Sequence, residues 1–111
     1  MAFAAPTMET HAQSIAPTTL PTGGRIVGGQ AAITQSGSSM AIQQTTTKAA
    51  LDWQSFSIGS QATVRFNQPS ASSIALNRVL GNDGSQILGQ LSANGQVFLI
   101  NPNGILFGRG A

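Results

Sequence analysis

Residues 85–108 read SQILGQLSANGQVFLINPNGILFG, and this stretch carries the clearest structural pattern in the chain. Short apolar segments begin near Ile87, Val97 and Ile105, and turn-forming Asn and Gly residues separate them. Each segment has the length of one strand and is too short for a stable helix. Residues 97–100 are apolar without interruption, which is typical of strands covered on both faces. The stretch therefore predicts successive short strands that meet at corners.

The tetrapeptide Asn101, Pro102, Asn103 and Gly104 suits a type I turn at every position. An Asn side chain at the first position can bond to the backbone two residues on, and Pro at the second already has the required φ angle. Such a turn would let the segments on either side pack on one core. The alternative is a hairpin centred on Asn103 and Gly104. Pro102 counts against the hairpin, because its ladder would lose an amide donor.

The chain from Arg25 onward continues the same pattern of short segments between turn residues. In residues 62–67, Ala62, Val64 and Phe66 alternate with polar side chains, as in a strand with one buried face. Further strands are expected at residues 32–34, 40–45, 86–92 and 96–100. Residues 71–80 fit either a strand or a helix, and their neighbours favour a strand. The expected fold class is all-β.

Strands of this kind can form a sandwich of hairpins, or a β-solenoid in which the chain always advances in the same sense around corners. The solenoid is favoured because only 7% of the residues are charged. Stacked coils place like residues above one another, where charges repel but Ser, Thr, Asn and Gln can bond in ladders. The short, regular steps between apolar segments also fit one side plus one corner. We expect a partial parallel β-helix.

The first part of the chain differs from the rest. Residues 1–24 are rich in Ala, Pro and Thr, and Pro disfavours regular pairing. We expect a disordered leader or linker there, and a domain at residues 25–111. Residues 10–12, before Gln13, have the small residues of a signal-peptide cleavage site, so a remnant of a signal peptide is the alternative.

Composition argues against several classes of function. The net charge is only +2, and the cations Arg25, Lys48, Arg65, Arg78 and Arg109 lie far apart in the sequence, so we expect no nucleic-acid binding. No segment approaches the roughly 18 to 20 apolar residues of a membrane span.

Chemistry-bearing residues are also scarce. The absence of Cys excludes disulfides and thiol catalysis, and His11 is the only histidine. Glu9, Asp52 and Asp83 are isolated acids, whereas a polysaccharide-cleaving β-helix needs clustered carboxylates or calcium. We expect no catalytic residue, no metal site and no cofactor.

Residues 62–111 closely resemble the filamentous haemagglutinin-type secretion domain, or haemagglutination activity domain, of bacterial two-partner secretion systems. The segments that carry the resemblance are FNQP at 66–69, ALNRV at 75–79, SQILGQL at 85–91, ANGQVFLI at 93–100 and NPNGILFG at 101–108. The segment LPTGG at 20–24 fits the family's usual opening.

The resemblance implies a right-handed parallel β-helix at the N-terminus of a large secreted exoprotein, often a virulence-associated adhesin. It implies as partner an outer-membrane transporter whose periplasmic POTRA domains recognise the domain. Export would then run through the periplasm of a Gram-negative bacterium to the cell surface. Family domains continue further and carry a second Asn-Pro-Asn motif ending in Leu, which this sequence lacks. We therefore expect a fragment or a truncated form.

The candidate structural and recognition residues are Asn101, Pro102, Asn103, Gly104, Asn67, Asn77, Arg78, Asn94 and Gly95. We expect the first four to form a corner, with contact to the transporter as a second role. Asn67 and Asn77 resemble family positions and are expected in buried amide ladders or turn caps.

Arg78, one of these candidates, and Trp53 have open interpretations. Arg78 is expected to pair with Asp83 or to stay solvated, with transporter recognition as a further role. Trp53 beside Asp52 is expected in the core, with sugar stacking as the alternative. For the whole chain, secretion targeting is the favoured function, and an adhesive module that binds host glycan or protein is the alternative.

Overall fold

The computed structural model describes residues 15–108, which form strands and no helix. The strands are β1 (Arg25–Gly28), β2 (Ala31–Ser36), β3 (Ser39–Gln44), β4 (Lys48–Trp53), β5 (Thr63–Asn67), β6 (Ile74–Val79), β7 (Ser85–Ile87), β8 (Gln90–Ala93), β9 (Gln96–Ile100) and β10 (Ile105–Phe107). Residues 15–108 include no helix with the length and apolar character that a membrane span requires.

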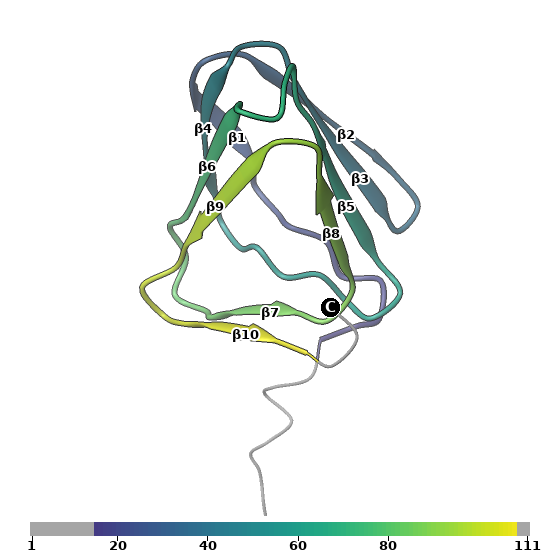
Figure 1. Cartoon of the computed structure of the whole chain (residues 1–111). Helices are drawn as coiled ribbons and strands as arrows, with labels where there is room; N and C mark the ends of the chain where they lie inside the picture. Colours follow the sequence, from purple (N-terminus) through teal and green to yellow (C-terminus); the bar gives the residue numbers. More distant parts are fainter. Residues whose placement is uncertain (1–14, 109–111) are drawn as a thin grey trace, which may run out of the picture.

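Three sheets form the sides of a triangle (Figure 1). One sheet has the order β1-β4-β6-β9, the second β2-β3-β5-β8, and the third pairs β7 with β10. The chain visits the three sides in a fixed sequence, and we call one such pass a coil. Strands of successive coils pair in parallel: β3 with β5 and β5 with β8 in one sheet, and β4 with β6 and β6 with β9 in another. The expected same-sense progression is present in these strands.

The first two strands depart from that progression. β1 pairs antiparallel with β4, and β2 forms an antiparallel hairpin with β3. The hairpin is possible because Gly37, at φ +58°, begins a tight two-residue turn between the paired Ser36 and Ser39. β1 and β2 thereby cover the outer edges of β4 and β3. A wholly parallel arrangement, as we expected, is therefore wrong for this end of the fold.

Two segments, residues 86–92 and 97–100, differ from the expectation, and a third, residues 71–80, agrees with it. Residues 86–92 were expected to be one strand, but the chain turns at Leu88 and Gly89 and places β7 and β8 in different sheets. Residues 97–100 are not covered on both faces, because Phe98 and Ile100 are 49% and 46% exposed. Residues 71–80 contain the strand β6, as favoured over a helix.

The ordered fold begins before Arg25. Leu20 is 6% exposed within the core cluster, and the Thr22 amide donates to the Ser55 carbonyl at 3.0 Å. Residues 15–24, which we placed in the leader, thus lie against the first coil because they supply apolar surface and several backbone hydrogen bonds to it, through Pro17, Thr19 and Thr22. Residues 1–14, the rest of the expected leader, lie outside the described residues.

The core lies inside the triangle and is built from inward side chains of all three sides. Its largest member, Trp53, is 1% exposed and meets Phe56 edge to face at 5.3 Å between ring centroids. The Trp53 indole N–H donates to Oδ1 of Asn77 at 2.8 Å, and Asn77 is itself fully buried. A buried indole needs such an acceptor. Trp53 is therefore a core residue, as expected, and sugar stacking is excluded.

Replacing Asn77 with Ala should destabilise the fold, because the Trp53 N–H then has no acceptor in the core. We expect a loss of about 1–3 kcal/mol in the free energy of unfolding, measured by urea denaturation. The matched control is Asn82→Ala at an exposed position, which should stay within about 0.5 kcal/mol of the parent. Equal losses in the two variants would contradict the role of the buried amide.

Candidate functional site

The segment Asn101 to Gly104 forms the corner between β9 and β10. The Gly104 amide donates to the Asn101 carbonyl at 3.0 Å, and the Asn103 amide donates to Oδ1 of Asn101 at 2.9 Å. Pro102 and Asn103 are the two central residues of this turn. Gly104 has φ +102°, which favours glycine. The expected turn is present, and the hairpin alternative is wrong because β9 and β10 lie in different sheets (Figure 1).

Side-chain amides attach this corner to the same corner of the preceding coil. Asn101, which is 9% exposed, donates from Nδ2 to the Asp83 carbonyl at 3.0 Å and to Oγ of the buried Ser85 at 2.9 Å. Asn103 donates from Nδ2 to the Gly81 carbonyl at 2.9 Å. The corner therefore stacks the third coil on the second through hydrogen bonds that the turning backbone does not make.

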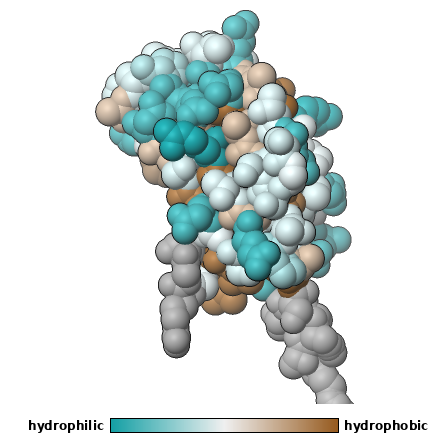
Figure 2. All heavy atoms as spheres, turned by 90° about the vertical axis from the view of Figure 1, so that its right-hand side faces the viewer, coloured by the Kyte–Doolittle hydropathy of each residue, from teal (hydrophilic) through white to brown (hydrophobic). Residues whose placement is uncertain are grey.

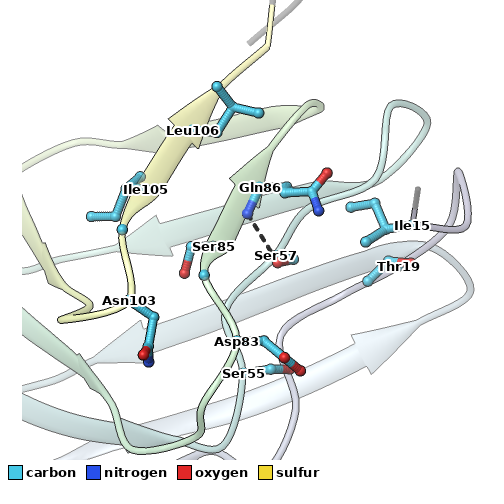
Figure 3. Close-up of a pocket in the computed structure, with 12 residues that line it drawn as sticks. Ile15, Thr19, Ser55, Ser57, Asp83, Ser85, Gln86, Asn103, Ile105 and Leu106 are labelled. Carbon is cyan, nitrogen blue, oxygen red and sulfur yellow. Dashed lines mark hydrogen bonds between the residues drawn. The ribbon is translucent and has the colours of Figure 1, made fainter. Parts of the chain in front are cut away.

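A groove of about 720 Å³ runs beside this corner (Figure 3). Asp83 and Asn103 lie at one end, Ile105 and Leu106 come from β10, and further groups come from β7 and from residues 55–57. The Gln86 amide donates to Oγ of Ser57 at 3.0 Å across it. The lining offers hydroxyl, amide and backbone groups beside apolar ones, which suits hydrogen bonding to an extended chain. Residues 15–108 contain no cluster of three or more His, Cys, Asp or Glu residues that could hold a metal ion.

Asn94 and Gly95 belong to a second corner, between β8 and β9. Asn94 accepts from the Gln68 amide at 2.7 Å and donates to the Gln68 carbonyl at 2.8 Å, so its side chain pairs with Gln68 as a neighbouring strand would. The Gly95 amide donates to Oε1 of Gln68 at 2.9 Å. A Cβ on Gly95 would lie 2.9 Å from that oxygen, so the close approach requires glycine.

Gln68 and Gln44 are structural residues that the sequence analysis missed. Nε2 of Gln68 donates to Oε1 of Gln44 at 3.3 Å and to the Gln96 carbonyl at 3.1 Å, and Gln44 in turn donates to the Ile74 carbonyl at 3.0 Å. Both side chains are buried. The ladder thus joins three coils. The signal in the sequence that could have identified these two residues is a Gln directly before the corner in each of two coils.

Asn67, by contrast, does not join this ladder. Its side chain is half-buried on the outer side of β5, where Oδ1 accepts from Nε of Arg65 at 2.8 Å. The expectation of a buried amide is therefore wrong for Asn67, because strand alternation turns its side chain outward and the next residue, Gln68, inward. For Asn77 the expectation of a buried amide is correct.

Arg78 pairs with Asp52, and the expected pairing with Asp83 is wrong. Nε and Nη2 of Arg78 lie 3.0 and 2.9 Å from the two carboxylate oxygens of Asp52. The two residues face each other in register on β6 and β4, whereas Asp83 lies beyond the end of β6. The hydrogen bond from Arg78 lowers the pKa of Asp52 below its ordinary value, although desolvation opposes the shift. The same bond raises the pKa of Arg78.

The Asp52–Arg78 pair should make folding stability depend on acid. The native pKa of Asp52 lies below the ordinary 3.8. The ion pair therefore contributes fully to the free energy of unfolding above that pH, and this contribution declines as the pH falls through the native pKa. We expect Arg78→Gln to lose less stability than the parent between about pH 5 and pH 2, measured by urea midpoints. Arg65→Gln, which removes a different cation, should keep the parental pH dependence. Identical acid profiles for the parent and Arg78→Gln would refute the assignment.

Asn101→Ala should weaken the first corner, since it removes the donor to Asp83 and Ser85 and the acceptor for Asn103. We expect a loss of about 1–3 kcal/mol in the free energy of unfolding by chemical denaturation. Pro102→Ala is the control, because Pro102 is exposed and its replacement should cost about 1 kcal/mol or less. A larger effect at Pro102 than at Asn101 would contradict this account.

The chain is similar to secretion domains and to the heme/hemopexin-binding proteins of one species. The family model of the TPS secretion domain, the domain of two-partner secretion, matches residues 12–111. A heme/hemopexin-binding protein of Haemophilus influenzae is 48% identical over 92 residues, covering 83% of this chain and 10% of the relative. Another of that name and species is 50% identical over 72 residues, covering 65% of this chain and 8% of the relative. The chain thus spans about a tenth of these relatives.

A solved structure agrees with the fold. The crystal structure of the HMW1 secretion domain from Haemophilus influenzae matches with a TM-score of 0.75 and 40% sequence identity, over 79% of this chain and 23% of that one. The match at the level of sequence extends through the two corners described above. From its family match over residues 12–111 and its likeness to the HMW1 secretion domain, we conclude that this chain belongs to the TPS secretion domain family.

Proposed function

We propose that this chain is the secretion-targeting domain of a large exoprotein exported by a Gram-negative bacterium. An outer-membrane transporter recognises it in the periplasm through POTRA domains, and it then nucleates β-helix folding at the cell surface. One observation carries the proposal. Each of the three sheets ends, within the described residues, in a strand of the third coil with a free backbone edge, namely β8, β9 and β10.

The proposed architecture is a right-handed parallel β-helix over residues 25–111, with residues 15–24 packed on its first coil. The parallel register of β3, β5 and β8 and of β4, β6 and β9 supports it. The antiparallel strands β1 and β2 occur only at the first coil, where they cover the edges opposite the free ones. The β-helix would therefore grow by adding further coils to the free edges of the third coil.

The third coil has the properties of a folding template. Leu91, Val97 and Leu99 point to the core but are only partly buried. A further coil stacked on them would remove their apolar surface from water, at about 25 cal/mol per Å². The free N–H and C=O groups of the edge strands would gain partners in the same step. Each added coil would leave a new edge for the next one.

The composition suits passage through a transporter. The chain has no Cys, so no disulfide can lock it in the oxidising periplasm. Long-range parallel pairing forms slowly, which leaves time for capture of an extended segment. Such a segment can add to a sheet edge of the transporter, where backbone hydrogen bonds provide affinity. The groove beside Asn101 to Gly104, which β10 lines with Ile105 and Leu106, and the exposed Asn103 contribute to this recognition.

Secretion of the exoprotein is the direct test. Deleting residues 62–107 from the exoprotein should abolish its appearance in the medium of a strain that makes the cognate transporter, measured by immunoblotting. Asn101→Ala should reduce secretion, whereas the matched control Pro102→Ala should leave it near the parental level. Normal secretion after the deletion would refute the proposal. Direct binding of the chain to cells or glycans, with no binding to the transporter's periplasmic domains, would establish the alternative of an adhesive module.

A further inference from the structure

The outward face of the sheet β1-β4-β6-β9 carries a continuous row of apolar side chains. Ala50, Leu76 and Phe98 stand opposite one another in register on β4, β6 and β9. Ile74 on β6 and Ile100 on β9 extend the row along the strands, Ile74 toward Lys48 and Ile100 toward Arg78. Leu76, Phe98 and Ile100 are 38%, 49% and 46% exposed. We call these five residues the apolar stripe, and nothing in the described residues covers it.

Cations border the apolar stripe along the strand direction. Lys48 is exposed at the start of β4, beside Ile74 on β6. Arg25 and Arg78 lie on either side of Asp52 at the other end of the sheet. The two borders are four residues apart on β4, or about 13 Å. Asp52 is 6% exposed and bonded to Arg78, so the exposed charge of this face is positive.

A shallow groove of about 290 Å³ opens beside the stripe. Its lining consists of Gly28, Gly29, Lys48, Ala49, Ala50, Ile74 and Leu76. The groove exists because the register of β1 shifts between Ile26 and Gly28, and the glycines bring no side chain over Ala50. Apart from Lys48, the groove offers only apolar side chains and backbone. An apolar chain that carries a negative charge near Lys48 matches this chemistry.

The neighbouring sheet has the opposite character. The outward side chains of β3, β5 and β8 include Gln43, Thr63, Arg65, Asn67 and Gln90. Figure 2 faces this side of the molecule and shows hydrophilic and neutral residues over most of it. The apolar stripe therefore has no counterpart on the sheet β2-β3-β5-β8.

We propose that the apolar stripe and its bordering cations form a docking surface for an anionic lipid membrane. The apolar side chains would enter the boundary of the acyl chains, while Lys48 and Arg25 contact lipid phosphates and Arg78 stays paired with Asp52. A second copy of the chain fits less well, because two such faces would oppose their cations. An acidic protein offers the same charge complementarity but fits less well, because protein interfaces carry about one hydrogen bond per 100–200 Å² and Gln96 is the one uncharged polar side chain on the described outward face of this sheet. This proposal does not depend on the secretion function.

Vesicle binding tests the proposal with the full chain. We expect the chain to cosediment with phosphatidylcholine vesicles that contain about one-third phosphatidylglycerol, and to bind pure phosphatidylcholine vesicles weakly. Lys48→Gln should lower the partition coefficient about fivefold. Phe98→Ser should lower it about tenfold. The matched controls lie on the other two sheets: Arg65→Gln removes the same charge, and Leu106→Ser removes a similarly exposed apolar side chain.

Several outcomes would overturn the proposal. Equal binding to neutral and anionic vesicles would remove the role of the cations. Equal weakening by Lys48→Gln and Arg65→Gln would show that net charge, and not this face, determines binding. Binding to soluble polyglutamate without binding to vesicles would assign the face to an acidic protein. If circular dichroism shows that Phe98→Ser does not fold, the exposed Lys48→Gln decides the result together with its Arg65→Gln control.

Discussion

A chain that turns between sheets at every corner must find partners for the backbone groups that its ladders lose there. In this fold, side-chain amides fill that need. Asn94 bonds both backbone groups of Gln68, and Asn101 bonds the Asp83 carbonyl and the Ser85 hydroxyl of the preceding coil. Each of these contacts joins residues that lie in successive coils. The amides therefore hold the corners in the register that the parallel strands require.

This constraint explains why the chain contains so little charge. Residues at equivalent places in successive coils lie about 4.8 Å apart, where like charges repel and neutral amides bond. Gln44 and Gln68 use this geometry at one corner. Charged residues do stand at equivalent places in two coils at Asp52 and Arg78. They are tolerated there because their charges are opposite and each neutralises the other. Burial of Asn77 against Trp53 extends the amide chemistry into the core itself.

The surface of the molecule divides according to the same architecture. Along the coil axis, one end is covered by β1 and β2, and the other presents the free edges of β8, β9 and β10. Around the axis, the sheets β2-β3-β5-β8 and β1-β4-β6-β9 lie on different sides of the triangle (Figure 1), and the first of them is largely polar (Figure 2), whereas the second carries the apolar stripe. The proposed growth of a β-helix and the proposed docking to lipid therefore use different parts of the surface, and one does not obstruct the other.

Local sequence determined the strands, the family and the corner at Asn101 to Gly104, because alternation and turn chemistry act between residues close in the chain. It did not determine which strands meet. The partner of Arg78 is 26 residues away in Asp52, and Gln68 acts through residues of two other coils, so only the tertiary register selects these contacts. The break within residues 86–92 and the antiparallel β1 and β2 have the same origin. Strand alternation tells which side chains share a face, but the stacking of coils decides what that face touches.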